Sequence, residues 1–97
     1  RNKHAQIEKV LVQKYGRKAF NAMENFRPYI GMPEGIVREY KLVMQDVNFH
    51  AYGFVRVEYG YKVYLPTQFF ATTASYINAR FPRAIYTKNG KVAAIKW

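Results

Sequence analysis

The sequence predicts an α+β domain with an antiparallel sheet. Apolar residues recur at helical spacing near the N-terminus and again before residue 80. Two stretches of the second half alternate apolar and polar residues around a glycine turn, which is typical of hairpins. The 97 residues suffice for one domain. We therefore expect two short N-terminal helices, an antiparallel sheet built from two hairpins plus an extra strand, and one helix between the hairpins.

The two N-terminal helices follow each other directly. The first covers residues 5–15 and ends at Gly16, since glycine readily takes the left-handed conformation that stops a helix. Its apolar face consists of Ile7, Val10, Leu11 and Tyr15. The second covers residues 17–26 and ends before Arg27-Pro28, because the residue before a proline avoids helical angles. Its apolar face consists of Phe20, Met23 and Phe26.

The central stretch is less regular. Residues 30–35 (IGMPEG) are expected to form a loop. Residues 36–47 fit both a helix and a strand. The helical face would be Ile36, Tyr40, Val43, Met44 and Val47. One strand face would be Ile36, Tyr40, Leu42 and Met44, with Arg38 as the exception. The β-branched and aromatic content favours the strand.

Residues 52–65 are expected to form the first hairpin. A three-residue loop, Tyr59-Gly60-Tyr61, would pair Glu58 with Lys62. This register separates apolar from polar side chains better than a two-residue turn at Tyr59-Gly60, so we expect it to form. It places Val55, Val57, Val63 and Leu65 in the core. The other face carries Phe54, Arg56, Glu58, Lys62 and Tyr64.

A helix is expected between the hairpins, over residues 68–80. Thr67 is its N-cap, and Pro82 prevents it from continuing. Its apolar face consists of Phe69, Phe70, Thr73, Ala74 and Ile77, with Phe81 just beyond.

The second hairpin is expected over residues 83–97. Asn89-Gly90 supplies the two left-handed positions of a type I′ turn, which pairs Lys88 with Lys91. Continued along the strands, this register pairs Tyr86 with Ala93 and Ala84 with Ile95. The expected core side carries Tyr86, Ile95 and Trp97. The opposite side carries Arg83, Ile85, Thr87, Val92, Ala94 and Lys96.

Charge is the strongest global signal. Sixteen Lys and Arg residues oppose six Asp and Glu residues, giving a net charge of +10. Self-repulsion of this size favours a polyanionic partner, and nucleic acid is the leading candidate.

The absence of cysteine fits a reducing compartment such as the cytoplasm. No apolar run approaches the roughly 18 residues that span a bilayer. The first residue is Arg1, so we expect the domain to be part of a longer protein, whose targeting segment is unknown.

Signatures of cofactor and metal chemistry are absent from the sequence. It has no glycine-rich phosphate loop and no H-E-x-x-H or G-x-S-x-G motif, so we expect no cofactor. His4 and His50 match no zinc-ligand spacing, and we expect no metal site. Glu39 and Lys41 have an E-x-K spacing found in metal-dependent nucleases. The partner acid normally precedes it, but Asp46 follows and Glu34 precedes by only five residues, so Glu39 and Lys41 are interpreted as solvated charges.

Three basic patches are candidate nucleic-acid contacts. The first lies at the junction of the first two helices and consists of Lys14, Arg17 and Lys18. The second spans the last helix end and the second hairpin and consists of Arg80, Arg83, Lys88, Lys91 and Lys96. The third is the polar face of the first hairpin and consists of Phe54, Arg56, Lys62 and Tyr64. Basic residues beside aromatic rings are typical of surfaces that bind single strands.

These patches lead to three functional hypotheses. The first is a nucleic-acid-binding domain, with RNA or single-stranded DNA favoured over duplex DNA. The second is a toxin-like, metal-independent ribonuclease, in which His50 is the catalytic residue together with lysine, arginine or tyrosine. The third is a structural module of a virion or ribonucleoprotein, whose charge neutralises packaged nucleic acid.

Overall fold

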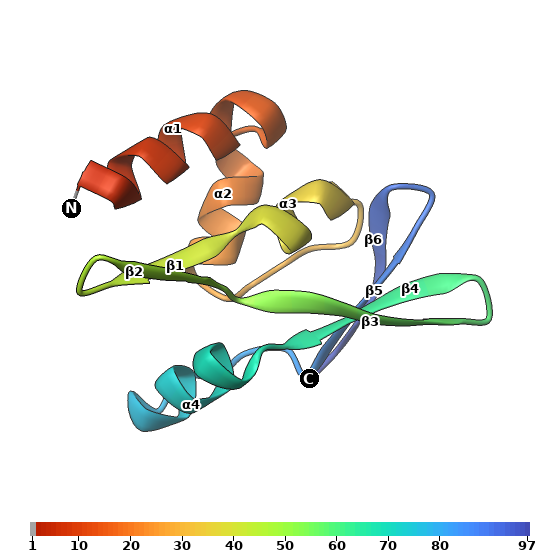
Figure 1. The fold of residues 1–97 in the computed structure, drawn as a ribbon. Helices are drawn as coiled ribbons and strands as arrows, with labels where there is room; N and C mark the ends of the chain where they lie inside the picture. The colour runs from red at the N-terminus through yellow and green to blue at the C-terminus, as the bar shows by residue number, and fades with distance from the viewer. Residues whose placement is uncertain (1) are drawn as a thin grey trace.

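The computed structural model describes residues 2–97, which form four helices and six strands (Figure 1). The helices are α1 (Asn2–Tyr15), α2 (Arg17–Glu24), α3 (Glu34–Glu39) and α4 (Gln68–Tyr76). The strands are β1 (Lys41–Met44), β2 (Val47–His50), β3 (Tyr52–Glu58), β4 (Tyr61–Pro66), β5 (Ala84–Lys88) and β6 (Lys91–Lys96). Both sheets are antiparallel: β1 pairs with β2, and the larger sheet has the order β3-β4-β5-β6. The predicted α+β class is confirmed.

The two N-terminal helices form as the sequence predicts. Gly16 separates them with a φ of 94°, a conformation that costs glycine little. Helix α2 buries Phe20 and Met23 on its inner face. It ends two residues before the predicted boundary, and Phe26 lies beyond it with a left-handed φ of 55°.

The ambiguous central stretch divides into a helix and a hairpin. Helix α3 takes in the end of the expected loop, and Ile36 and Val37 are completely buried on it. The strand pattern holds only from Lys41, where β1 begins. Gln45 and Asp46 then turn the chain with φ values of 50° and 64°, and β2 follows. The strand prediction was wrong for residues 36–39, because a helix of one and a half turns can bury adjacent apolar residues that a strand would point to opposite sides.

The first hairpin of the larger sheet has a different register from the one predicted. Tyr59-Gly60 is a two-residue turn with φ values of 52° and 83°, so Glu58 pairs with Tyr61 rather than with Lys62. Both positions are left-handed, as in type I′ turns, whose twist matches that of the strands. A β-bulge between Phe54 and Arg56 adds a second shift.

Burial along this hairpin differs in part from the predicted core assignment. Tyr64, expected on the polar face, is 1% exposed in the core. Val57, expected in the core, is 63% exposed, and Val55 is also exposed. Val63 is buried as predicted, although it lies on the opposite face from Tyr64.

The second hairpin begins as predicted and then changes register. Lys88 pairs with Lys91 across the Asn89-Gly90 turn. A bulge then shifts the strands, so that Tyr86 pairs with Ala94 and not with Ala93. The predicted core side is therefore wrong for β5 and for much of β6. Ile85, Thr87 and Val92 are buried, whereas Tyr86 is partly exposed and Trp97 exposed.

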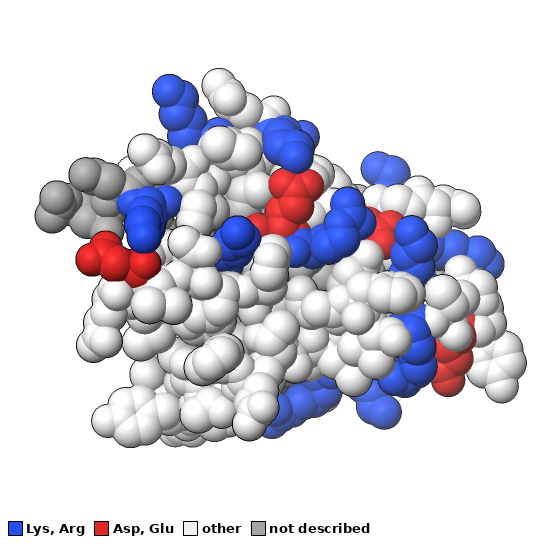
Figure 2. All heavy atoms as spheres, in the orientation of Figure 1, with Lys and Arg blue, Asp and Glu red and all other residues white. Residues whose placement is uncertain are grey.

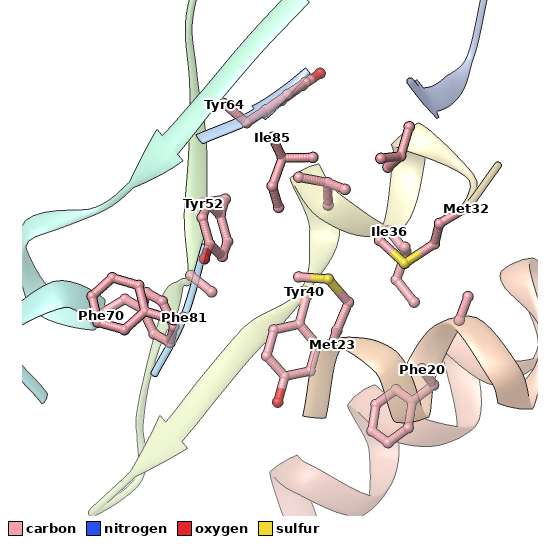
Figure 3. Close-up of a cluster of buried hydrophobic side chains, with 14 of the residues drawn as sticks. Phe20, Met23, Met32, Ile36, Tyr40, Tyr52, Tyr64, Phe70, Phe81 and Ile85 are labelled. Carbon is pink, nitrogen blue, oxygen red and sulfur yellow. The ribbon is translucent and has the colours of Figure 1, made fainter. Parts of the chain in front are cut away.

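The pairing partners define the two faces of the four-stranded sheet, because residues directly opposite each other in antiparallel strands point to the same side. One row across β3 to β6 consists of Phe54, Tyr64, Ile85 and Ile95. This row lies on the core face, where Tyr64 and Ile85 point toward the side chains of α2 and α3 (Figure 3). The next row consists of Arg56, Val63, Tyr86 and Ala94 and points to the other side. Helices α1, α2 and α3 gather on the core side of the sheet (Figure 1).

Helix α4 starts where the sequence predicts it. The Thr67 hydroxyl accepts a hydrogen bond from the Phe70 backbone N–H, so Thr67 is its N-cap. The helix ends at Tyr76, before the predicted boundary at residue 80. Phe70 packs in the core against Tyr52 and Phe81, but Phe69 is exposed, contrary to the predicted apolar face. Within residues 2–97, no helix combines the length and the apolar character that crossing a membrane requires.

Candidate nucleic-acid interface

The face of the four-stranded sheet away from α1–α3, here called the open face, carries two adjacent tyrosines. The strand pairing assigns it Arg56, Glu58, Tyr61, Val63, Leu65, Ala84, Tyr86, Lys88, Lys91, Ala94 and Lys96. The ring centroids of Tyr61 and Tyr86 lie 6.4 Å apart, with the planes at 87°. Both rings are partly exposed and line a shallow hollow of about 360 Å³ together with Glu58, Tyr59 and Ala94. Aromatic surface is thus accessible from solvent at the middle of the sheet.

One lysine contacts this tyrosine pair, and two others lie on the same face. The Lys88 ammonium lies 4.9 Å from the centroid of the Tyr61 ring, within the range of a cation–π interaction. Lys91 lies opposite Lys88, and Lys96 lies further along β6. The face carries one acid, Glu58, whose carboxylate is 3.4 Å from the Arg56 guanidinium. The open face is therefore both aromatic and basic.

The predicted second patch contributes three of its five residues to this face: Lys88, Lys91 and Lys96. The other two lie elsewhere. Arg83 is placed with its guanidinium 4.5 Å from the centroid of Phe81. Arg80 lines a hollow with Arg27 and Trp97, and the Arg27 guanidinium is 5.2 Å from the Trp97 ring centroid. The patch that looked continuous in sequence is thus divided between two surfaces.

The predicted first patch makes contacts within the chain itself. The Lys14 ammonium is 2.9 Å from a carboxylate oxygen of Glu39, and the Arg17 guanidinium is 2.5 Å from one of Glu8. The Lys18 ammonium is 4.3 Å from the centroid of the Tyr29 ring. These charges are partly neutralised, so the patch offers less net charge to a polyanion than its sequence indicates.

The predicted third patch does not form. Tyr64 is buried, and its hydroxyl donates a 2.5 Å hydrogen bond to the buried carboxylate of Glu34. Lys62 extends to the same carboxylate, 3.8 Å away. Phe54 lies on the core face beside Tyr64 and is 52% exposed, while the bulge places Arg56 on the open face. The prediction that Tyr64 stacks on a base is therefore wrong, because the register turns its ring inward.

Sequence reasoning missed the two tyrosines of the open face. Tyr61 was interpreted as a turn residue and Tyr86 as a core residue, since the predicted registers placed them there. The prevalence of two-residue loops in hairpins is a signal that could have placed Tyr61 in a strand, with Tyr59-Gly60 as the turn. The bulge that sets the neighbours of Tyr86 has no local signature.

His50 lies at a second site, a cleft of about 400 Å³ between α1 and the β1–β2 hairpin. Lys41 and Glu39 also line this cleft. Glu39 accepts hydrogen bonds from the Tyr15 hydroxyl and the Lys14 ammonium, which hold the pKa of its carboxyl below the usual range. The Glu39 carboxylate remains partly exposed, in agreement with its interpretation as a solvated charge, and is paired with Lys14 and Tyr15. His4 lies apart from the cleft, with its ring 6.3 Å from that of Phe20.

Charged groups are distributed unevenly over the surface. Lys and Arg side chains cover the side of α1–α3 and the hairpin ends, whereas the surface around α4 shows none at the lower left of Figure 2. The exposed side chains of α4 include Phe69, Tyr76 and the following Ile77. No group of three or more His, Cys, Asp or Glu residues within residues 2–97 is arranged to hold a metal ion.

Comparisons of the chain with protein-family models, with curated proteins and with solved structures returned no significant match. The function therefore has to be inferred from the chemistry of the site.

Proposed function

We propose that this domain binds single-stranded nucleic acid on the open face of its four-stranded sheet. The observation that carries the proposal is the pair Tyr61 and Tyr86, partly exposed on a sheet face that α1–α3 leave uncovered. Lys88 lies beside Tyr61, and two more lysines, Lys91 and Lys96, share this face. Bases stack on such rings, and each stacked base contributes about 1–3 kcal/mol. Lysine ammonium groups contact the phosphates between the bases.

A single strand suits this face better than a duplex. The flat faces of the bases are accessible in a single strand, whereas in a duplex they are covered by neighbouring base pairs. Base stacking and phosphate contacts do not involve the 2′-hydroxyl, so both RNA and single-stranded DNA are candidate ligands. The net charge of +10 adds a long-range attraction to either of them.

The test is a fluorescence anisotropy titration of labelled single-stranded RNA and DNA at several salt concentrations. Tyr86→Ala should weaken binding about 5- to 150-fold, which corresponds to the loss of one stacking contact. Tyr76→Ala is the matched control, since Tyr76 is 90% exposed on α4, outside the open face, and its loss should not change the affinity.

Lysine substitutions test the phosphate contacts separately. Lys88→Ala should reduce the slope of log K against log salt by about 0.7, the value for one phosphate contact of a single strand. Lys9→Ala, on the exposed side of α1, serves as the charge-matched control. Equal effects of Tyr86→Ala and Tyr76→Ala, or an affinity that does not depend on salt, would contradict the proposal.

A further inference from the structure

The cleft between α1 and the β1–β2 hairpin combines an apolar wall with groups that can transfer protons. The wall comes from α1 and consists of Ile7, Val10 and Leu11. The polar lining residues are Gln6, Glu39, Lys41 and His50. An apolar wall beside convergent polar groups is the usual composition of a small-molecule or substrate site.

The strand register brings His50 and Lys41 together. They are direct partners in the β1–β2 ladder, so both side chains leave the ribbon on the same side. In such pairs the Cβ atoms lie about 4.5–5.5 Å apart. An imidazole and an ammonium group are therefore adjacent on the wall opposite α1.

Glu39 connects this wall to a second cation. The Lys14 ammonium donates to both carboxylate oxygens, at 2.9 and 3.1 Å, and the Tyr15 hydroxyl donates to one of them. Three of the roughly four lone-pair sites of the carboxylate are thus occupied. Gly35 makes room for the Tyr15 ring, because a Cβ at this position would overlap it. Glu39 is accordingly held in place at the cleft by Tyr15 and Lys14, whose ammonium group does not itself line the cleft.

We propose that this cleft cleaves the phosphodiester bonds of RNA without a metal ion. The His50 imidazole takes the proton from the ribose 2′-hydroxyl, and the 2′-oxygen attacks the adjacent phosphorus. The bond between phosphorus and the 5′-oxygen breaks, and the Lys41 ammonium donates a proton to that leaving oxygen. The products are a 2′,3′-cyclic phosphate and a free 5′-hydroxyl.

The reaction balances with the groups present. The imidazolium returns its proton to the Lys41 amine through solvent, so no net proton, water or oxidant is consumed. The Lys41 ammonium group also stabilises the negative charge that develops on the phosphoryl oxygens. A base adjoining the scissile bond packs on Ile7, Val10 and Leu11. RNA is the substrate class because its 2′-hydroxyl supplies the nucleophile, and DNA has none.

The test is an incubation of the whole chain with single-stranded RNA in EDTA, with products analysed for 2′,3′-cyclic phosphate ends. His50→Ala should lower the initial rate about 100-fold or more, the usual contribution of one general acid or base. His4→Ala is the matched control and should leave the rate unchanged, since His4 contacts Phe20 and Glu24 outside the cleft.

Lys41→Arg separates proton donation from charge. Arginine keeps the positive charge but does not release its proton, so the rate should fall about 10-fold or more while RNA affinity stays the same. The absence of cyclic phosphate products from the unmodified chain would overturn the proposal. A rate that His50→Ala leaves unchanged would overturn it equally, because the cleavage would then come from elsewhere.

The two sites can be tested independently. Tyr86→Ala should weaken binding on the open face without changing the rate at saturating RNA. Salt-dependent binding without cleavage would overturn the catalytic proposal and leave the binding proposal standing. Cleavage that depends on His50, with no loss of affinity in Tyr86→Ala, would support the catalytic site and contradict the open-face interface.

Discussion

Two valines of the same cross-strand row, Val57 and Val92, should respond oppositely to the same substitution, because only Val92 is buried. Val92 is 2% exposed on the core face, beside the loop that contains Met32. Burying a valine side chain contributes about 1.5–3 kcal/mol. In Val92→Asp this contribution is lost, and a buried carboxylate without a partner costs several further kcal/mol, roughly. The total stability of a domain of this size is about 5–15 kcal/mol, so we expect Val92→Asp to be largely unfolded.

Val57→Asp should instead be tolerated. Val57 is 63% exposed, and its direct cross-strand partner is Lys62. The lower strand propensity of aspartate costs up to about 1 kcal/mol. The new opposite-charge pair with Lys62 recovers about 0.2–1 kcal/mol of this. The free energy of unfolding should therefore change by less than about 1 kcal/mol.

Urea unfolding followed by circular dichroism measures both variants. Val92→Ala provides a folded reference, because the loss of two methyl groups at about 0.8 kcal/mol each, with a small cavity, should cost about 2 kcal/mol. If Val57→Asp unfolds the domain while Val92→Asp remains folded, the exposure of Val57 and the burial of Val92 are both wrong.

Two further predictions concern the tyrosine–glutamate pairs. Tyr64→Phe removes the 2.5 Å hydrogen bond to Glu34, which is 6% exposed. The free energy of unfolding, measured in urea, should fall by about 1.5–3 kcal/mol. Tyr59→Phe, at the exposed turn, is the control and should leave it unchanged. The hydrogen bonds from Tyr15 and Lys14 lower the pKa of Glu39 in the folded state. The ionised carboxylate therefore stabilises the fold at pH values above the ordinary carboxyl pKa of about 4.3. This stabilisation is lost as the pH falls through the lower pKa of the folded state. Glu39→Gln should therefore reduce the loss of stability on acidification below about pH 4, and an unchanged acid sensitivity would contradict this assignment.

Elements that depend on local chemistry could be predicted from the sequence. Gly16 ends α1 in the left-handed conformation, Thr67 caps α4, and Asn89-Gly90 turns the last hairpin. Each of these features involves backbone groups only a few residues apart, so neighbouring residue types suffice to indicate it. The basic composition, and with it the expectation of a polyanionic partner, is also a property of the sequence alone.

The faces of the strands were decided by the tertiary structure. Two bulges, one after Phe54 and one at Ala93, shift the pairing, and a shift of one residue moves every following side chain to the other face. Together with the two-residue turn at Tyr59-Gly60, these shifts explain why the sequence indicated Tyr64 as the exposed ring, whereas the fold buries Tyr64 and leaves Tyr61 and Tyr86 partly exposed.

The cleft residues show the same division. His50 and the basic residues could be named as candidates from residue type, because imidazole and ammonium groups have known chemistry wherever they occur. Their grouping with Glu39 and the apolar face of α1 depends on contacts between segments more than twenty residues apart, such as the 25-residue separation of Lys14 and Glu39. The sequence by itself determined which chemical groups this protein has and where its chain turns. Only the packing of α1 and the register of the strands decided which of those groups meet, because each depends on the free energy of the whole core.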